Sequence, residues 1–268
     1  MNKQKAENFL QKKIKDQGDT TTFFDNFIIY YGLEQGSPIW RNLIKFPQDL
    51  VLNFWEQLLN SKSNRFSSYE NRSKENCLLT GAKRTIVYQD LLMSQGTHSL
   101  IKWKDLDVYK TAYDFVIYWM LISELKPNTI IEYGSGTGGS AIWLADISTA
   151  MGLDINVISY DIKPPNVTHP KVDFIGIDLE KDFIEEKQWP GKKLVIEDAH
   201  VNIKEVLLKT DLHLKMGDYL IVEDSEGKQS EIVDFLFNAK NTYKTDNYYL
   251  DFFGRNNTCC VDSIFKVF

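Results

Sequence analysis

The sequence predicts an α/β fold, in which a mostly parallel β-sheet is covered by helices on both faces and closed by a C-terminal antiparallel hairpin. Short apolar runs alternate with helix-like segments from residue 129 onwards, as in a parallel sheet. A glycine-rich stretch at residues 132–140 joins the first of these runs to a helix. The last two β-rich runs are separated only by residues 254–257, which is too short for a crossover helix.

Composition excludes several classes of protein. Of the 268 residues, 43% are hydrophobic and 13% are aromatic, which is enough for a substantial core. The formal net charge is −6, whereas a nucleic-acid-binding protein usually carries an excess of positive charge. The longest apolar run, at residues 115–122, is far shorter than the roughly 20 residues of a membrane span. The three cysteines form no CxxC pattern, so a reducing, cytoplasmic location is expected.

The N-terminal part, residues 1–105, is predicted to be a mainly helical extension ahead of a cofactor-binding domain, residues 106–268. Apolar residues recur at helical spacing in residues 23–31 and 49–59. Residues 61–75 are rich in Ser, Asn, Arg and Lys, and they are predicted to form an exposed loop. The extension is expected to cover the substrate pocket or to mediate assembly, and a homo-oligomer is expected.

The second region begins with a predicted helix at residues 109–125, which ends before Lys126 and Pro127 because proline restricts the residue ahead of it. Five strands are predicted at residues 129–133, 156–161, 172–177, 193–196 and 219–223. Helices are predicted at residues 140–151, 201–214 and 230–242. The terminal hairpin is predicted to pair residues 248–253 with residues 259–268, which places Cys259 and Cys260 in a buried, unreactive strand.

The glycine loop follows the first strand and reads Glu132-Tyr-Gly-Ser-Gly-Thr-Gly-Gly-Ser140. Glycines at a helix N-terminus let the backbone approach a ligand, which points to an adenosine cofactor. The spacing also satisfies the dinucleotide fingerprint, so NAD is an alternative. The acid Glu132 and the terminal hairpin together resemble class I S-adenosylmethionine-dependent methyltransferases with a Rossmann-like sheet. The predicted cofactor-binding residues of this loop are Glu132, Gly134, Ser135, Gly136, Gly138 and Ser140.

Two further acids extend the predicted cofactor site. Asp161 ends the second strand, where a carboxylate can accept hydrogen bonds from ribose hydroxyls. Asp178 follows the third strand and is predicted to receive the adenine amine, although Asp173, Glu180 and Asp182 lie nearby in the sequence.

Pairs of acids follow the fourth and fifth strands, namely Glu197-Asp198 and Glu223-Asp224. Carboxyl ends of parallel strands meet at one edge of a sheet, which is where ligands bind in such folds. Carboxylates that converge repel one another, and a hard divalent cation such as Mg²⁺ relieves that repulsion. The alternative is that these acids cap the following helices, and for Asp198 that alternative is equally open.

His200 is one of four histidines, and it alone lies at a predicted strand end beside carboxylates. The ordinary pKa of imidazole, near 6.5, suits a general base at neutral pH. His200 is therefore predicted to be the catalytic residue, against the alternative of a structural histidine.

Four motifs together carry a closer resemblance. They are Lys110-Thr-Ala-Tyr-Asp114 with Tyr118, the glycine loop, Ile196-Glu-Asp-Ala-His200, and Gly217-Asp-Tyr-Leu-Ile-Val-Glu-Asp224. This pattern resembles the cephalosporin hydroxylase family of methyltransferases and is similar to metal-dependent macrolide-sugar O-methyltransferases. The resemblance implies that Glu197, Glu223 and Asp224 bind Mg²⁺ and that His200 is the base. The first ligand is commonly Asp in these relatives, so the choice between Glu197 and Asp198 is open.

The sequence therefore predicts an Mg²⁺-dependent O-methyltransferase that uses S-adenosylmethionine and acts on a hydroxyl of a small natural product. Two alternatives are an NAD-dependent oxidoreductase and a non-catalytic partner protein built on the same scaffold. The terminal hairpin and Glu132 argue against the oxidoreductase.

Overall fold

The computed structural model describes residues 65–72, 88–182 and 189–268. The helices predicted at residues 23–31 and 49–59 lie outside the described residues. The strands are β1 (Phe66–Ser67), β2 (Ile101–Trp103), β3 (Leu106–Val108), β4 (Thr129–Tyr133), β5 (Asn156–Asp161), β6 (Val172–Gly176), β7 (Lys193–Glu197), β8 (Tyr219–Val222), β9 (Tyr243–Asp246) and β10 (Ile264–Val267). The helices are α6 (Tyr88–Met93), α7 (Ala112–Leu125), α8 (Gly139–Ala150), α9 (Ile203–Asp211), α10 (Gln229–Asn238) and α11 (Asn247–Leu250), with a 3₁₀ turn at Ser225–Gly227.

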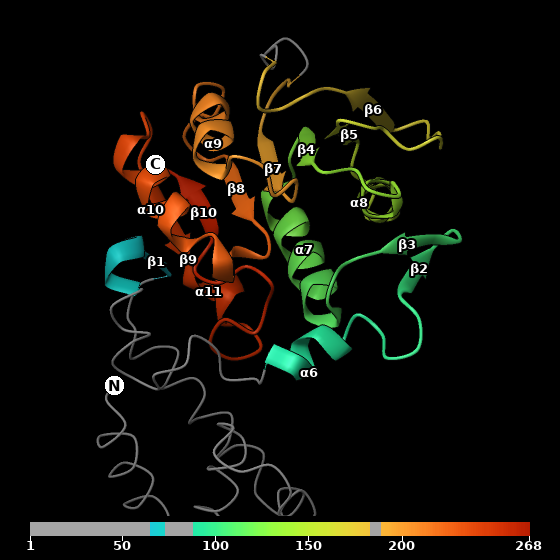
Figure 1. Cartoon of the computed structure of the whole chain (residues 1–268), viewed down its shortest axis with the longest axis horizontal. Helices are drawn as coiled ribbons and strands as arrows, with labels where there is room; N and C mark the ends of the chain where they lie inside the picture. Colours follow the sequence, from blue (N-terminus) through green and yellow to red (C-terminus); the bar gives the residue numbers. More distant parts are fainter. Residues whose placement is uncertain (1–64, 73–87, 183–188) are drawn as a thin grey trace, which may run out of the picture.

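One sheet organises the described residues, in the strand order β1-β9-β10-β8-β7-β4-β5-β6 (Figure 1). The five strands from β8 to β6 are parallel, whereas β10 runs antiparallel to both β8 and β9. This arrangement confirms the predicted fold class, a mostly parallel sheet with a C-terminal antiparallel pair. The central strands β4, β7 and β8 are buried along their whole length, as expected for a sheet covered on both faces.

Alternating side chains of the central strands enter two separate cores. Ile130 of β4 packs in the core that contains residues of α7 and α8. Its neighbour Ile131 packs in the core that contains residues of α9 and α10. This alternation follows from the two-residue period of a strand, and it explains why the predicted strands read as nearly continuous apolar runs.

The C-terminal hairpin differs from its prediction in register and in its connection. Residues 248–253 were predicted to be a strand, but they contain the end of α11 and the turn after it. The strand that pairs with β10 is β9, with Phe265 opposite Thr245. The side chain of Asp246 accepts a hydrogen bond from the Tyr248 backbone nitrogen and so caps α11. Cys259 and Cys260 are buried as predicted, but they lie in the connection between α11 and β10 and not in a strand.

Part of the segment predicted as an exposed loop belongs to the sheet. Residues 66 and 67 form β1, which pairs with β9, and Arg72 is only 2% exposed. The guanidinium of Arg72 donates to Asp262 at 2.5 Å and to both carboxylate oxygens of Asp251, at 2.7 and 3.0 Å. A further hydrogen bond joins it to Asn256 at 2.7 Å. Arg72 therefore fixes the connection between α11 and β10. These hydrogen bonds explain why Arg72, in a polar stretch of the sequence, is buried.

Arg72→Met is expected to lower the free energy of unfolding by about 3–5 kcal/mol, because buried carboxylates lose their counter-charge. Lys171→Met is the matched control, since Lys171 and Asp154 form a pair whose side chains are 38% and 90% exposed. Removing a surface pair of this kind costs about 0–1 kcal/mol. Urea unfolding of the full chain measures both values, and equal losses in the two variants would contradict a special role for Arg72.

A small hairpin lies ahead of α7 and straddles the predicted boundary at residue 105. Strand β2 pairs with β3, and both pack on α8. The hairpin also supports the glycine loop, because the Thr137 hydroxyl donates to the Asp107 carbonyl oxygen at 2.6 Å. Among the residues that the structure describes, none of the helices has the length and apolar character that a bilayer span requires.

Candidate functional site

The glycine loop lies between β4 and α8, as predicted, and two of its glycines are required by the backbone. Gly134 has a φ of 93°, and a Cβ there would lie 2.5 Å from the carbonyl oxygen of Asp198. Gly138 has a φ of 84°, and a Cβ there would lie 2.9 Å from Val167. Gly136 also has a positive φ, of 49°, but a Cβ there would meet open space. The loop is therefore packed against β7 on one side and open on another.

Glu132 lies beneath the loop and is fully buried. Its carboxylate accepts hydrogen bonds from the hydroxyls of Ser140 and Ser159, and Ser159 in turn contacts the hydroxyl of Ser135 at 2.7 Å. Burial raises the pKa of Glu132, while the charge of Lys110 opposes the rise. The structure thus places Glu132, a predicted cofactor-binding residue, behind serine hydroxyls, from where it orients the loop.

Asp161 and Asp178 lie at the rim of the same site. One carboxylate oxygen of Asp161 accepts a hydrogen bond from the Gly136 backbone nitrogen at 3.2 Å, and the other accepts from the Lys163 backbone nitrogen at 2.9 Å. Asp178 contacts the ammonium of Lys181 at 2.6 Å, and this hydrogen bond lowers the pKa of the Asp178 carboxyl. The end of β5 is therefore tied to the open part of the glycine loop.

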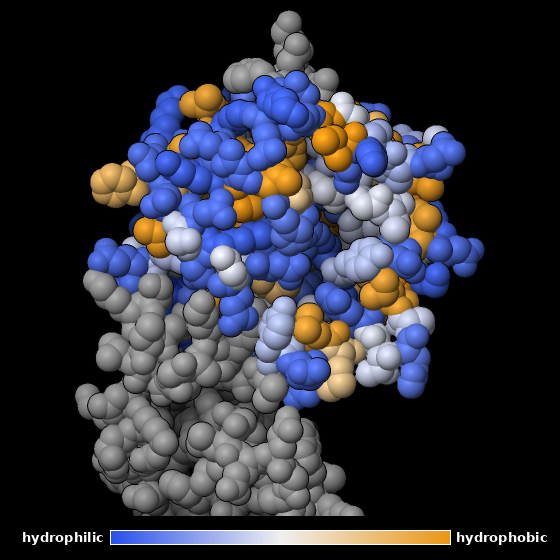
Figure 2. Space-filling view, viewed as in Figure 1, coloured by the Kyte–Doolittle hydropathy of each residue, from blue (hydrophilic) through white to orange (hydrophobic). Residues whose placement is uncertain are grey.

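A cavity of about 620 Å³ extends from the glycine loop to the ends of β7 and β8. Six of the eight predicted cofactor-binding residues line it, and the exceptions are Glu132 and Gly138. The lining also includes Asp198, His200 and Asp224. The face shown in Figure 2 is mainly hydrophilic, with apolar side chains in separate patches. The cavity thus joins the predicted cofactor site to one part of the predicted metal site.

Glu197 ends β7 and is fully buried, facing away from the cavity. One of its oxygens accepts hydrogen bonds from the backbone nitrogens of Ala199 and His200, both at 3.0 Å, and the other accepts from Lys228 at 2.8 Å. Lys228 follows β8, so this ion pair ties together the ends of the two strands that carry the acids. The geometry gives Glu197 a role in shaping the turn after β7 and does not bring it to the cavity.

Asp198, His200 and Asp224 form the group that faces the cavity, with one ligand atom from each within 4.8 Å of the others. The Nε2 atom of His200 lies 3.3 Å from Asp198 and 3.7 Å from Asp224. His200 and Asp224 both have a positive φ, 57° and 45°, which is uncommon for side-chain-bearing residues and concentrates at functional sites. The hydrogen bond to Asp198 raises the pKa of His200. Burial, with the charge of Asp198, raises the pKa of Asp224.

Glu223 lies next to this group but is held by other partners. Its carboxylate accepts hydrogen bonds from Lys110 at 2.5 Å and from the Tyr118 hydroxyl, and the residue is 2% exposed. Burial raises the pKa of Glu223 well above its usual range. Burial also opposes ionisation of Asp198, but the charge of Lys110 and the hydrogen bonds to His200 and Lys110 together outweigh it and lower the pKa of that carboxyl. The predicted metal set of Glu197, Glu223 and Asp224 is therefore not brought together, and Asp198 takes the place beside Asp224.

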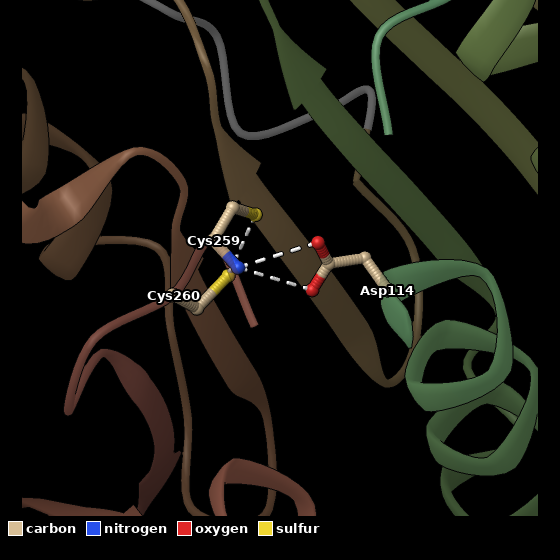
Figure 3. A group of neighbouring side chains, drawn as sticks. All are labelled: Asp114, Cys259 and Cys260. Atoms are coloured by element: carbon tan, nitrogen blue, oxygen red, sulfur yellow. Dashed lines mark hydrogen bonds between the residues drawn. The ribbon is translucent and has the colours of Figure 1, made fainter. Parts of the chain in front are cut away.

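Asp114, Cys259 and Cys260 form a second group of neighbouring polar side chains (Figure 3). Asp114 points from α7 to the backbone nitrogen of Cys259, which lies 3.3 Å from both carboxylate oxygens. The same carboxylate accepts from the hydroxyls of Thr111 and Thr258. Since Asp114 is saturated with hydrogen bonds and buried, this group fixes the start of α7 to the connection before β10.

One residue of the site was left undecided by the sequence, and another was missed. Asp198 was weighed as a helix cap and as the alternative to Glu197, and the structure places Asp198, but not Glu197, in the lining of the cavity. Lys110 was noticed only as part of a motif, yet it lines the cavity and is 1% exposed. A lysine at the start of a predicted helix carries no signal of burial, because lysines are mostly exposed.

The donor set fits a hard divalent cation. Two carboxylates and an imidazole converge on one side of the cavity, and Mg²⁺ commonly uses one or two carboxylates and completes its shell with water and substrate. The other end of the cavity, with Gly136 and Asp161, offers backbone approach and a carboxylate acceptor to a nucleoside.

Comparison with known proteins gives a family match. The family model for rhamnosyl O-methyltransferase/CmcI matches residues 95–247. The rhamnosyl O-methyltransferase of Mycobacterium leprae is 33% identical over 136 residues, which cover 46% of this chain and 59% of that protein. That of Mycobacterium bovis is 31% identical over 134 residues, 45% of this chain and 55% of that protein. The chain thus spans between half and two thirds of the length of these relatives.

Solved structures support the fold. A structure of CmcI with Mg and SAM superposes with a TM-score of 0.53 at 23% identity, over 63% of this chain and 76% of that chain. A CmcI structure with SAH gives the same TM-score at 22% identity, over 64% of this chain and 84% of that chain. At this level of identity the likeness establishes the shared fold alone.

Proposed function

The chain belongs to the rhamnosyl O-methyltransferase/CmcI family, and we propose that it transfers the methyl group of S-adenosylmethionine to a hydroxyl of a small molecule with the help of a divalent cation. One observation carries the proposal: a single cavity connects the glycine loop and Asp161 to the group formed by Asp198, His200 and Asp224. The cofactor and the reacting hydroxyl can therefore meet in one cavity. The similarity to rhamnosyl O-methyltransferases and to a CmcI structure with Mg and SAM supports this choice.

In this proposal, the loop end of the cavity binds the cofactor. Asp161 accepts hydrogen bonds from the ribose hydroxyls, and Gly136 leaves room for the cofactor beside the backbone. Asp178 lies further along the rim and is placed to accept from the adenine amine. Glu132 acts indirectly, because its carboxylate orients Ser140, which does line the cavity.

Asp198 and Asp224 are the proposed ligands of the divalent cation. Each comes from the end of a different parallel strand, and both line the cavity. Glu197 is instead a positioning residue, since its hydrogen bonds to the nitrogens of Ala199 and His200 hold the turn that carries Asp198. This assignment replaces the ligand set of Glu197, Glu223 and Asp224 that the family resemblance implies.

His200 is the proposed general base. The imidazole accepts the hydroxyl proton, and Asp198, 3.3 Å from its Nε2 atom, stabilises the imidazolium that forms. When bound, S-adenosylmethionine supplies the methyl group and the cation supplies positive charge beside the reacting oxygen. The hydroxyl oxygen forms the new bond to the methyl carbon, and the electron pair of the broken bond stays on sulfur. The chain contributes mainly by positioning these groups.

A small natural product that carries a sugar is the proposed acceptor, which follows from the similarity to rhamnosyl O-methyltransferases. The test is incubation of the full chain with S-adenosylmethionine, Mg²⁺ and a panel of rhamnosides and other hydroxylated glycosides, followed by mass spectrometry. A gain of one methyl group on oxygen supports the proposal. Binding of NAD in place of S-adenosylmethionine would contradict it.

Asp161→Ala is expected to weaken S-adenosylmethionine binding about tenfold or more, because hydrogen bonds to a charged acceptor are worth about 1.5–3 kcal/mol each. Calorimetry on the full chain measures the affinity without need of an acceptor. Asp173→Ala is the matched control, since Asp173 is exposed on β6 and does not line the cavity. Equal affinities in the parent and in Asp161→Ala would remove Asp161 from the cofactor site.

A further inference from the structure

Helix α6 and the turn after it form part of the cavity wall. Tyr88, Leu92 and Gln95 line the cavity, and all three side chains are uncharged. Their spacing of four and three residues puts them on one face of the helix and of its last turn. Leu91, by contrast, is buried, so α6 packs on the rest of the chain with a different face. The face that carries Leu92 is therefore turned towards the cavity.

Hydrogen bonds at the C-terminal end of α6 fix its position. The Ser94 hydroxyl donates to the Leu91 carbonyl oxygen at 2.6 Å and accepts from the backbone nitrogen of Ala112, the first residue of α7, at 3.2 Å. The Ile101 backbone nitrogen donates to the Gln95 carbonyl oxygen at 3.1 Å, which ties the turn to β2. Helix α6 thus lies beside the N-terminal end of α7 (Figure 1). This part of the wall is preformed.

Tyr109 adds a second aromatic ring to the wall. Ahead of it in the chain, the Asp107 carbonyl oxygen accepts from the Thr137 hydroxyl in the glycine loop. Directly after it, the ammonium of Lys110 lies 2.9 Å from Asp198. The Tyr109 side chain itself lines the cavity. The backbone therefore carries Tyr109 from the proposed cofactor site to the proposed cation site.

Tyr88, Leu92 and Tyr109 together form a surface that we call the apolar wall. Their exposed fractions are 50%, 41% and 54%. Large apolar side chains that line a cavity favour binding of a ligand that removes them from water. The proposed cofactor contacts use other lining residues, Gly136 and Asp161, so the apolar wall is left for the acceptor.

We infer that Tyr88, Leu92 and Tyr109 are specificity-determining residues that bind an uncharged, apolar group of the acceptor. This inference rests on the proposed function, in which the reacting hydroxyl lies beside His200. Tyr88 and Leu92 precede residue 95, where the match to the family model begins, so the family match does not include them. An acceptor glycoside is therefore expected to be recognised through its aglycone as well as through its sugar.

The test compares phenyl rhamnoside with methyl rhamnoside, which share a sugar and differ in the apolar area of the aglycone. Calorimetry on the full chain, saturated with S-adenosylhomocysteine and Mg²⁺, measures the dissociation constant of each. The parent is expected to bind the phenyl glycoside at least about tenfold more tightly. Leu92→Ser and Tyr109→Ala are each expected to lower this preference by about threefold or more. Met93→Ser is the matched control, because Met93 is also exposed on α6 but does not line the cavity.

Three results would overturn the inference. The first is a parent that binds the phenyl glycoside no more tightly than the methyl glycoside, or binds neither at millimolar concentration. The second is an equal loss of preference in Met93→Ser, which would reveal a general effect on α6. The third is a loss of about tenfold in S-adenosylmethionine affinity in Leu92→Ser or Tyr109→Ala, which would assign the apolar wall to the cofactor. Tyr109→Ala decides the matter if Leu92→Ser does not fold.

Methyl transfer to the two glycosides, followed by mass spectrometry, separates this inference from the proposed function. If the parent shows the expected binding preference but methylates neither glycoside, the proposed function is contradicted and the apolar wall stands as a binding surface. If the parent methylates both glycosides with equal kcat/KM, the inference fails and the proposed function stands.

Discussion

Removal of divalent cations with EDTA is expected to abolish methyl transfer while leaving S-adenosylmethionine bound, and Asp198→Asn is expected to do the same. The physical reason is that Asp198 and Asp224 face the cavity together, whereas the proposed cofactor contacts are made by other lining residues, Gly136 and Asp161. Loss of one of the two proposed carboxylate ligands removes both charge and geometry from a hard-cation site. Turnover is therefore expected to fall below detection, with cofactor affinity changed by less than about threefold.

The measurement combines calorimetry with S-adenosylmethionine and mass spectrometry of the methylated glycoside. Asp173→Asn is the isosteric control, since it removes a charge from an exposed position on β6. Addition of Mg²⁺ after EDTA is expected to restore activity to the parent but not to Asp198→Asn. Full turnover after exhaustive chelation would mean that the acidic group has a structural role.

Central strands were predictable because local sequence and burial agree there. Strand β4 begins shortly after Pro127 and ends at Tyr133, just before Gly134, and its apolar residues pack on both faces of the sheet. Parallel strands buried on both faces leave a continuous apolar signal that tertiary contacts do not alter. The bounds of β4 and β5 therefore agree with those predicted.

The C-terminal connection was not predictable for the opposite reason. Its aromatic residues at 248–253 have high β-propensity, but Asp246 caps a short helix at this point. The connection is then held by Arg72, which lies more than 170 residues earlier in the chain. Contacts over that separation leave no local pattern, so both the polar stretch around Arg72 and the aromatic run were assigned to the wrong structures.

In the site, too, the features set by local sequence were predictable and those set by distant residues were not. The sequence places four acids at the correct edge of the sheet, because each pair directly follows an apolar strand. It does not show which member of each pair faces the cavity. That choice depends on distant cations, since Lys228 binds Glu197 and Lys110 binds Glu223. Both oxygens of Glu197 and of Glu223 are occupied by hydrogen-bond partners, and the two acids that line the cavity are Asp198 and Asp224.

His200→Ala is expected to keep both S-adenosylmethionine and Mg²⁺ but to lose roughly 10²–10⁴-fold in turnover, the usual contribution of a positioned general base. The imidazole is 49% exposed, lines the cavity and lies 3.3 Å from Asp198, so it can reach a hydroxyl without leaving its carboxylate partner. His169→Ala is the matched control, because His169 contacts Asp146 and does not line this cavity.

Cation affinity distinguishes a base from a ligand at this position. The Nε2 atom of His200 belongs to the same group as the carboxylates of Asp198 and Asp224, so His200 is placed to bind the cation as well. In that case His200→Ala would remove a cation ligand together with the base. If His200 acts only as a base, His200→Ala keeps its Mn²⁺ affinity within about threefold of the parent. If His200 binds the cation, its removal weakens the Mn²⁺ affinity by about tenfold or more. Near-parental turnover in His200→Ala, with cofactor and cation saturating, would instead show that another group accepts the proton. Asp198 is the nearest such group, because its Oδ1 atom faces the same part of the cavity as the imidazole.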